Sequence, residues 1–138
     1  MTFQHTLHIQ TRGRGMTELT AAVRDAVRAS GVRTGLAHVF VRHTSCSLLI
    51  TENADPDVRR DLETLARRWA PDGDPAYRHD MEGDDDMAAH ARSVLTEVAL
   101  SMPVGDGELL LGTWQGIYLW EHRAQGHRRE LVVTVIGS

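Results

Sequence analysis

The sequence predicts an α+β fold: a single compact domain over residues 1–138, with a largely antiparallel sheet system covered by about three helices. Only three segments repeat apolar residues at helical spacing, and most of the remaining chain reads as strands and turns. Helices and strands do not alternate one for one, and the final third reads as a meander, which argues against a parallel sheet. The chain has 138 residues, 41% of them hydrophobic, and no repeat or linker, so we expect one core.

The first strand and the first helix are predicted on either side of the run RGRG, which turns the chain. Residues 3–11 alternate between apolar and polar positions, and this pattern is typical of a strand. The helix is expected to begin with Thr17 as its N-cap and to stop at Gly31. Its apolar stripe consists of Leu19, Val23, Ala26 and Val27.

Two strands and the second helix follow. Residues 35–43 and 46–52 read as strands around a tight polar break. Asp55 is a suitable N-cap and Pro56 suits the first helical position, so the helix is expected to begin there. Its apolar positions repeat at helical spacing and are Val58, Leu62, Leu65 and Trp69.

The last part of the chain is predicted to contain one helix and four strands. The helix covers about residues 86–97, where apolar residues again share one face. The strands are expected at about residues 99–103, 108–113, 115–123 and 130–136, joined by turns that contain glycine.

Composition excludes several functional classes. The formal charge is −4 and the pI about 6.0, which argues against nucleic acid as a partner. All 15 basic residues are arginine, so a Schiff-base lysine and a P-loop lysine are both excluded. Cys46 is the only cysteine, so no internal disulfide can form, and we expect it to be structural. Neither a signal peptide nor a membrane span is apparent, so we expect a cytoplasmic protein with no membrane partner.

The break between the two central strands carries a histidine and several hydroxyl groups. His43 lies on the same strand face as Val39 and Val41, so its imidazole is expected to point inward. The alternative is a core histidine bonded to a carbonyl beside a polar turn. The hydroxyl groups that follow suit the binding of an anion and belong to Thr44, Ser45 and Ser47.

The segment YRHDMEGDDDMAAH places a histidine near each end of an acidic run. His90 shares a helical face with apolar residues, and a partly buried neutral imidazole there can bind a transition metal. His79 lies eleven positions earlier, a spacing that matches no compact zinc motif. Two imidazoles with carboxylates suit zinc, manganese or iron. The alternative is an acidic loop in solvent.

Two further groups lie at strand ends. Glu52 and Asn53 precede the second helix, where a strand end and a helix start offer ligand groups. Arg59 and Arg60 on that helix are placed to reach an anion, but the alternative, a solvated helical arginine, is favoured for Arg60.

The run GTWQGIYLWEHR forms the other group. Glu121 and His122 end the two faces of one strand, and Arg123 is placed to clamp a phosphate or pair with an acid. Trp114 and Gln115 are suited to stack on and hydrogen-bond a flat ring, although a tryptophan there also fits a core.

Three stretches together carry a resemblance that spans nearly the whole chain: HTSCSLLITENADPDVRRDLE, YRHDMEGDDDMAAHARSVL and GELLLGTWQGIYLWEHR. They resemble the YjbQ-like family, sometimes described as secondary thiamine-phosphate-synthase-type proteins. The sequence departs from the family pattern at Cys46, usually an alanine, and at Ala88, often a proline. The resemblance implies a small α+β domain, a homotrimer, and a pocket that uses His43, His79 and His90. Further motif positions are matched by Glu52, Asn53, Asp85, Asp86, Gln115 and Glu121.

The activity implied by the resemblance is condensation of a pyrimidine pyrophosphate with a thiazole phosphate. Three hypotheses follow. The chain is an enzyme for phosphorylated small molecules, a transferase or a phosphohydrolase, with a divalent metal on His43, His79 and His90, zinc before manganese or iron. Alternatively it is a ligand-binding trimer without turnover, or the histidines form a structural ion site between subunits.

Overall fold

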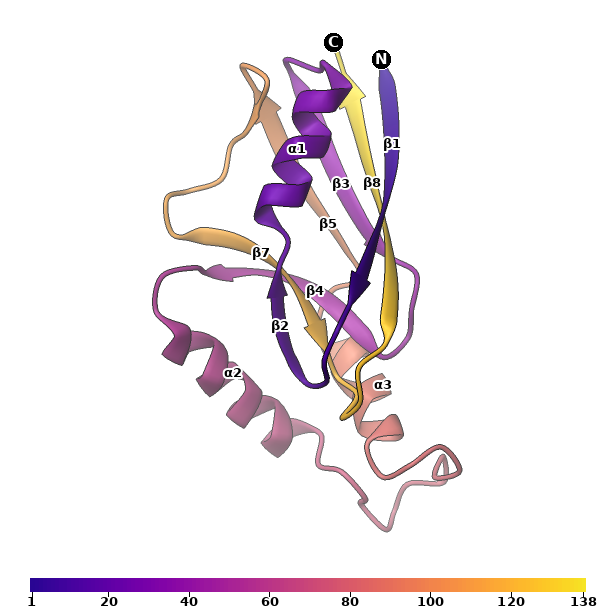
Figure 1. Cartoon of the computed structure of the whole chain (residues 1–138). Helices are drawn as coiled ribbons and strands as arrows, with labels where there is room; N and C mark the ends of the chain where they lie inside the picture. Colours follow the sequence, from indigo (N-terminus) through magenta and orange to yellow (C-terminus); the bar gives the residue numbers. More distant parts are fainter.

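The computed structural model describes residues 1–138 and consists of two antiparallel sheets and three helices (Figure 1). The larger sheet, sheet A, has the order β1 (Thr2–Gln10), β8 (Arg128–Gly137), β3 (Gly35–Val41), β5 (Ala99–Gly105) and β6 (Glu108–Leu109). The smaller, sheet B, has the order β2 (Gly15–Glu18), β7 (Gln115–Glu121) and β4 (Cys46–Glu52). The helices are α1 (Thr20–Ser30), α2 (Pro56–Trp69) and α3 (Asp86–Leu95). The predicted α+β class is therefore confirmed.

The first and last strands lie side by side, and Figure 1 shows both chain ends at the same end of sheet A. Their antiparallel register runs from Thr2 opposite Ile136 to Gln10 opposite Arg128. The Met1 amino group also donates a hydrogen bond of 2.8 Å to the Gly137 carbonyl. Strand β1 has no other partner in the sheet, because β8 separates it from β3.

The hydrophobic core lies between the inner faces of the sheets and α1. Helix α1 contacts β1, β6, β7 and β8, and it buries Val23, Ala26 and Val27. Alternate residues of β3 and β8 point into the same core, as the period of a strand requires. From these strands the core takes Ala37, Val39, Val41, Leu131, Val133 and Val135.

The sequence-based boundaries hold where a local signal fixes them. Asp55 caps α2, with its Oδ1 accepting a hydrogen bond of 2.9 Å from the Asp57 amide, and Pro56 is the first helical residue. Gly31 ends α1 in the left-handed conformation at φ 71°. Thr17 was predicted to cap α1, and this is wrong: it belongs to β2, which pairs with β7, and α1 begins at Thr20.

The predicted strand at residues 108–113 is also shorter than expected, because only Glu108 and Leu109 pair with β5. Helix α2 lies away from the main core, beside sheet B (Figure 1). Its predicted apolar stripe is only partly covered, since Ala66 is its one fully buried residue and Trp69 is 57% exposed. None of the three helices has the length and apolar character needed to cross a membrane.

Candidate functional site

The loop before α3 and the first turns of that helix bring two imidazoles to one carboxylate. His79 Nε2 lies 2.6 Å from Asp86 Oδ2, and His90 Nε2 lies 3.2 Å from the same oxygen. Asp86 and His90 are one helical turn apart on α3, so their side chains share a face. One ligand atom from each of the three residues lies within 4.8 Å of the others. We call these three residues the His–Asp cluster.

Arg123 holds the loop in this position. It follows β7, and its Nη1 lies 2.9 Å from Asp86 Oδ1 while its Nε donates to Asp85 Oδ2 at 2.9 Å. Its Nη2 also donates to the Glu82 carbonyl at 3.0 Å. Of the two roles predicted for Arg123, to clamp a phosphate or to pair with an acid, the structure shows the second, because its guanidinium pairs with Asp85 and Asp86.

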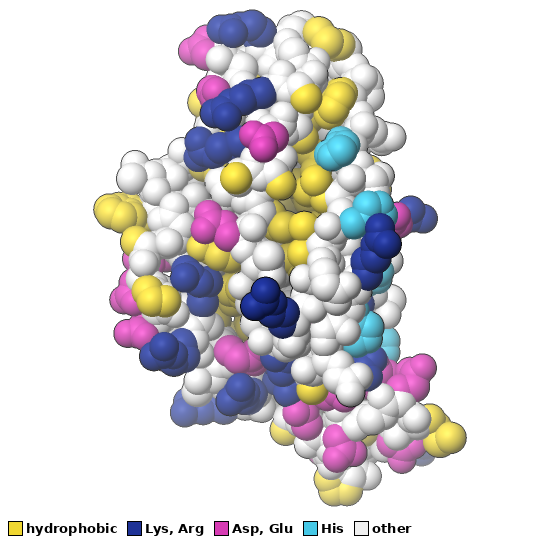
Figure 2. All heavy atoms as spheres, in the orientation of Figure 1, with side chains coloured by type: hydrophobic (Ala, Val, Ile, Leu, Met, Phe, Trp, Pro, Cys, Tyr) yellow, Lys and Arg dark blue, Asp and Glu magenta, His cyan; other side chains and the backbone are white.

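The cluster sits in an acidic surrounding, and Figure 2 shows acidic side chains gathered at the lower right, over the loop before α3. Burial raises the pKa of the Asp86 carboxyl group, but the hydrogen bond from His79 and the charge of Arg123 outweigh it. The net result is a pKa below the ordinary value. Asp86 is therefore ionised at neutral pH and is available as an anionic ligand.

The donor set fits a transition metal. Two imidazoles and a carboxylate are ligands for zinc, manganese and iron. His90 Nδ1 lies 3.2 Å from the Thr44 carbonyl oxygen. Because a carbonyl only accepts, this bond assigns a proton to Nδ1, and Nε2 is the ring nitrogen that faces Asp86. Such a bond to a backbone carbonyl is the usual support of a metal-binding histidine.

His43, the third predicted imidazole, is not brought into the His–Asp cluster. Its Nε2 accepts a hydrogen bond of 2.8 Å from the Glu130 amide, so this nitrogen is already engaged. Burial and the charge of Arg129 lower the pKa of His43. It does share a pocket of about 470 Å³ with His90, lined also by Thr44 and residues of the α3 C-terminal region.

Three other predicted site residues are buried. Glu121 is 1% exposed, and its carboxylate pairs with Arg129 and accepts a hydrogen bond of 2.6 Å from Thr11 Oγ1. The Ser45 hydroxyl accepts from Arg129 at 3.0 Å, and Ser47 Oγ lies 2.8 Å from His122 Nε2. These groups hold the protein interior together and do not face a pocket.

Arg129 was missed at the sequence level, although a signal for it exists. It has the same strand parity as Leu131, Val133 and Val135, all buried on β8. An arginine on the apolar face of a strand requires a buried carboxylate partner, so the pattern alone points to an internal ion pair.

The remaining predicted residues lie at the opposite end of sheet B. Glu52 pairs with Gln115, whereas Cys46 pairs with Glu121, so the two ends of β4 are about 20 Å apart. Glu52 Oε2 accepts a hydrogen bond of 2.7 Å from the Asp55 amide, and Asn53 Nδ2 donates to the Thr113 carbonyl at 3.2 Å. Within one chain, these groups do not meet the His–Asp cluster.

Trp114 and Gln115, the two residues expected to bind a flat ring, differ in how far their side chains are engaged by the protein. Gln115 Oε1 accepts a hydrogen bond of 2.8 Å from the Gly112 amide, which closes the turn before β7. Trp114, next to it, is 64% exposed, so it is not a core residue and its indole face is open to solvent.

Acid titration of His122 is expected to destabilise the protein. Burial, helped by the charges of Arg92 and Arg14, lowers the pKa of His122 from 6.5 to about 3. Below pH 6.5 the unfolded chain binds a proton that the folded chain rejects, so stability falls as the pH drops. Between pH 6.5 and 5.0 the His122 contribution amounts to about 2 kcal/mol.

Urea denaturation at pH 7.0 and 5.0 measures this difference. The variant His122→Gln is expected to lose about 2 kcal/mol less than the parent chain between these pH values. The control His8→Gln changes an exposed histidine of β1 and is expected to lose as much stability between the two pH values as the parent chain. Equal losses of stability in the parent and His122→Gln would show that the buried imidazole is not responsible for the pH dependence.

Comparison with known proteins identifies the family of the chain. The model of the family described as UPF0047 protein YjbQ-like matches residues 5–138. The UPF0047 protein sll1880 of Synechocystis sp. is 49% identical over 135 residues, which cover 98% of this chain and 92% of that protein. The UPF0047 protein YjbQ of Salmonella typhimurium is 44% identical, with 100% of both chains covered.

One solved structure is similar to this chain in both fold and sequence. An uncharacterized conserved protein of the YjbQ/UPF0047 family from Clostridium acetobutylicum superposes with a TM-score of 0.88 at 34% identity. The match covers 96% of this chain and 99% of the other.

Proposed function

Because the chain belongs to the YjbQ-like UPF0047 family, we propose that it is a metal-dependent enzyme for phosphorylated small molecules, with the His–Asp cluster as its metal site. One observation carries the proposal: three donor atoms of the ligand types that transition metals prefer lie within 4.8 Å of one another. The bonds from His90 to Thr44 and from Arg123 to Asp86 support it, because they orient two of the ligands.

Zinc is the first candidate, with manganese and iron as alternatives, and such an ion supplies a Lewis acid for a phosphoryl oxygen or a diphosphate leaving group. The pocket of about 470 Å³ beside His90 is where we place the organic part of the substrate. Its lining offers the Thr44 hydroxyl and the His43 ring for polar contacts.

We further propose a reaction for this site. In a condensation resembling secondary thiamine-phosphate synthase, a pyrimidine pyrophosphate loses pyrophosphate as its carbon bonds to a thiazole phosphate. Arg123 keeps Asp86 ionised and in place for this chemistry. A phosphohydrolase would use the same ligands with water as the acceptor.

We also propose that the chain forms a homotrimer. One face of sheet A is covered by α1, while Leu36, Phe40 and Ile136 are exposed on the other. Leu36 pairs with Ile136 across β3 and β8, so these side chains share one open face that suits contact between subunits. The exposed indole of Trp114 then needs a second copy of the chain to approach a substrate beside His90.

The test is elemental analysis of protein purified without an affinity tag or chelator, with the variant His79→Ala/His90→Ala alongside. We expect near-stoichiometric metal in the parent and at least about 100-fold weaker binding in the variant, because loss of an outer-shell partner alone costs about 10–100-fold. The variant His5→Ala/His8→Ala removes two exposed histidines of β1 and controls for nonspecific binding.

Turnover is followed in the same samples as pyrophosphate released from the pyrimidine substrate. Metal and turnover that both disappear in the cluster variant support the proposed enzyme. Equal metal content in all three proteins would contradict the site. Tight binding of the phosphorylated compound without product would instead favour a ligand-binding protein.

A further inference from the structure

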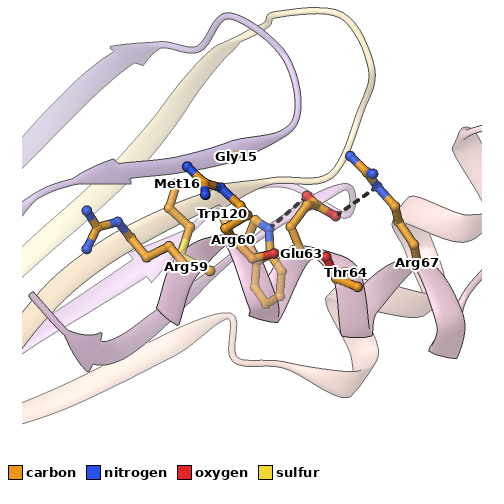
Figure 3. A pocket seen from close by; sticks show the side chains of 8 residues that line it. All are labelled: Gly15, Met16, Arg59, Arg60, Glu63, Thr64, Arg67 and Trp120. Carbon is orange, nitrogen blue, oxygen red and sulfur yellow. Dashed lines mark hydrogen bonds and ion pairs between the residues drawn. The ribbon is translucent and has the colours of Figure 1, made fainter. Parts of the chain in front are cut away.

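A second hollow lies between α2 and the edge strand β2 and has no part in the proposed metal site. It has a volume of about 260 Å³. Figure 3 shows that α2 forms one wall, with Arg59 and Arg67 at the two ends and Glu63 between them, while Gly15 and Met16 of β2 lie on the other side. The Trp120 indole of β7 contributes to the lining. We call this hollow the arginine groove.

The charge of the groove is opposite in sign to that of the whole chain. Three arginines, Arg59, Arg60 and Arg67, line it with a single acid, Glu63, although the formal charge of the protein is −4. In Figure 2, basic side chains lie over α2 at the lower left, well apart from the acidic loop before α3. A hollow lined mainly by one sign of charge concentrates ligands of the other sign.

The one acid in the groove is already neutralised from within. Glu63 Oε2 accepts a hydrogen bond of 2.8 Å from Arg92 Nη1, and the Trp120 indole N–H lies 3.4 Å from Oε1. Arg92 is 2% exposed, so its charge is directed at Glu63 from the protein interior. Its Nε and Nη2 have no hydrogen-bond partner. The carboxylate therefore does not cancel the three groove arginines.

These arginines keep most of their donors free. Arg59 uses only Nη1, for the Glu52 carbonyl and the Tyr118 hydroxyl, and Arg60 uses only Nη1, for Asp57. The Arg67 side chain makes no hydrogen bond, and its Nε forms only a long ion pair of 4.0 Å with Glu63 Oε2. A guanidinium has five N–H donors, and several guanidiniums together match the oxygens of a phosphoryl group.

From these observations we propose that the arginine groove binds a phosphorylated small molecule through Arg59, Arg60 and Arg67, at a site separate from the His–Asp cluster. The volume is below the roughly 300 Å³ at which pockets for drug-sized ligands begin, so the ligand is a compact anion such as a diphosphate or a small phosphate ester. Met16 and the edge of Trp120 are the apolar groups against which its organic part packs. The inference does not depend on the proposed enzyme.

The test is calorimetric titration with inorganic pyrophosphate at low ionic strength, in EDTA so that no divalent metal takes part. We expect the variant Arg59→Gln/Arg67→Gln to bind at least about 10-fold more weakly than the parent chain. The control Arg33→Gln/Arg128→Gln removes two exposed arginines outside the groove and is expected to change affinity less than about 2-fold. Thermal unfolding checks that each variant is folded.

A further variant separates this site from the metal site. His79→Ala/His90→Ala is expected to bind pyrophosphate in EDTA as tightly as the parent, whether or not it still binds metal. The inference is overturned if the parent does not bind pyrophosphate, if both arginine pairs weaken binding equally, or if the cluster variant alone loses it.

Discussion

Replacing Glu121 by alanine is expected to lower the free energy of unfolding by about 3–5 kcal/mol, because it leaves the buried Arg129 guanidinium without its partner. Arg129 Nε donates to Glu121 Oε1 at 2.8 Å, and a second bond joins Arg129 Nη2 to Oε2. Burial raises the pKa of Glu121, but the bonds from Arg129 and Thr11 outweigh it and leave the pKa lowered. The pair therefore stabilises the fold fully above the unfolded pKa of about 4.3 and is lost as the pH falls through the lowered folded value.

Urea denaturation at pH 7 measures the effect, with Glu130→Ala as the matched control. Glu130 also pairs with an arginine, Arg42 at 2.7 Å, but both side chains are partly or largely exposed. Exposed pairs contribute about 0–1 kcal/mol, so the control is expected to lose little. Similar losses of stability in the two variants would show that burial does not make the Glu121 pair more stabilising than an exposed ion pair.

Replacing Glu63 by alanine is expected to cost about 3 kcal/mol for a related reason. Arg92 is 2% exposed, and the bond to Glu63 is the only one its guanidinium makes, since Nε and Nη2 have no partner. Removal of the acid leaves the buried Arg92 charge without its hydrogen-bonded partner and also takes away the acceptor of the Trp120 indole.

The double variant Glu63→Ala/Arg92→Met provides the control, because it removes the charge together with its partner. We expect it to recover most of the loss, since an apolar side chain of similar length can replace a buried ion pair at little cost. Urea denaturation of the parent, Glu63→Ala, Arg92→Met and the double variant gives a complete double-mutant cycle. If the double variant is as unstable as the sum of the single variants, the two residues do not act as a pair.

The parts of the fold that the sequence predicts are those with a local cause. Asp55 and Pro56 fix the start of α2, and Gly31 fixes the end of α1, through backbone conformations that need no distant partner. Strand β2 has no such cause. Its four residues carry no periodicity, and they become a strand because β7 pairs with them from a hundred residues away. Thr17 was therefore misread as a helix cap.

The same distinction applies to the candidate site. The spacing of Asp86 and His90 is a local helical relation, whereas the approach of His79 depends on how the loop closes over Arg123. His43 shows the limit of strand parity. The alternation of side chains along the strand predicts that its ring turns inward, but the Glu130 amide that occupies its Nε2 belongs to another strand. Predicted site residues on one strand, such as Glu52, are separated from the cluster by the length of the strand itself.

The pairing of the first strand with the last has a consequence for synthesis on the ribosome. Thr2 pairs with Ile136, so β1 remains without its only partner until residues 128–137 of β8 have been translated and have left the exit tunnel. Contacts of such long sequence separation form late and slow the folding of the whole domain. At about 5–20 residues per second, β1 is exposed for several seconds as an unpaired strand. Its polar positions, with Gln4, Thr6 and His8 on one face, limit the aggregation that such a nascent edge invites.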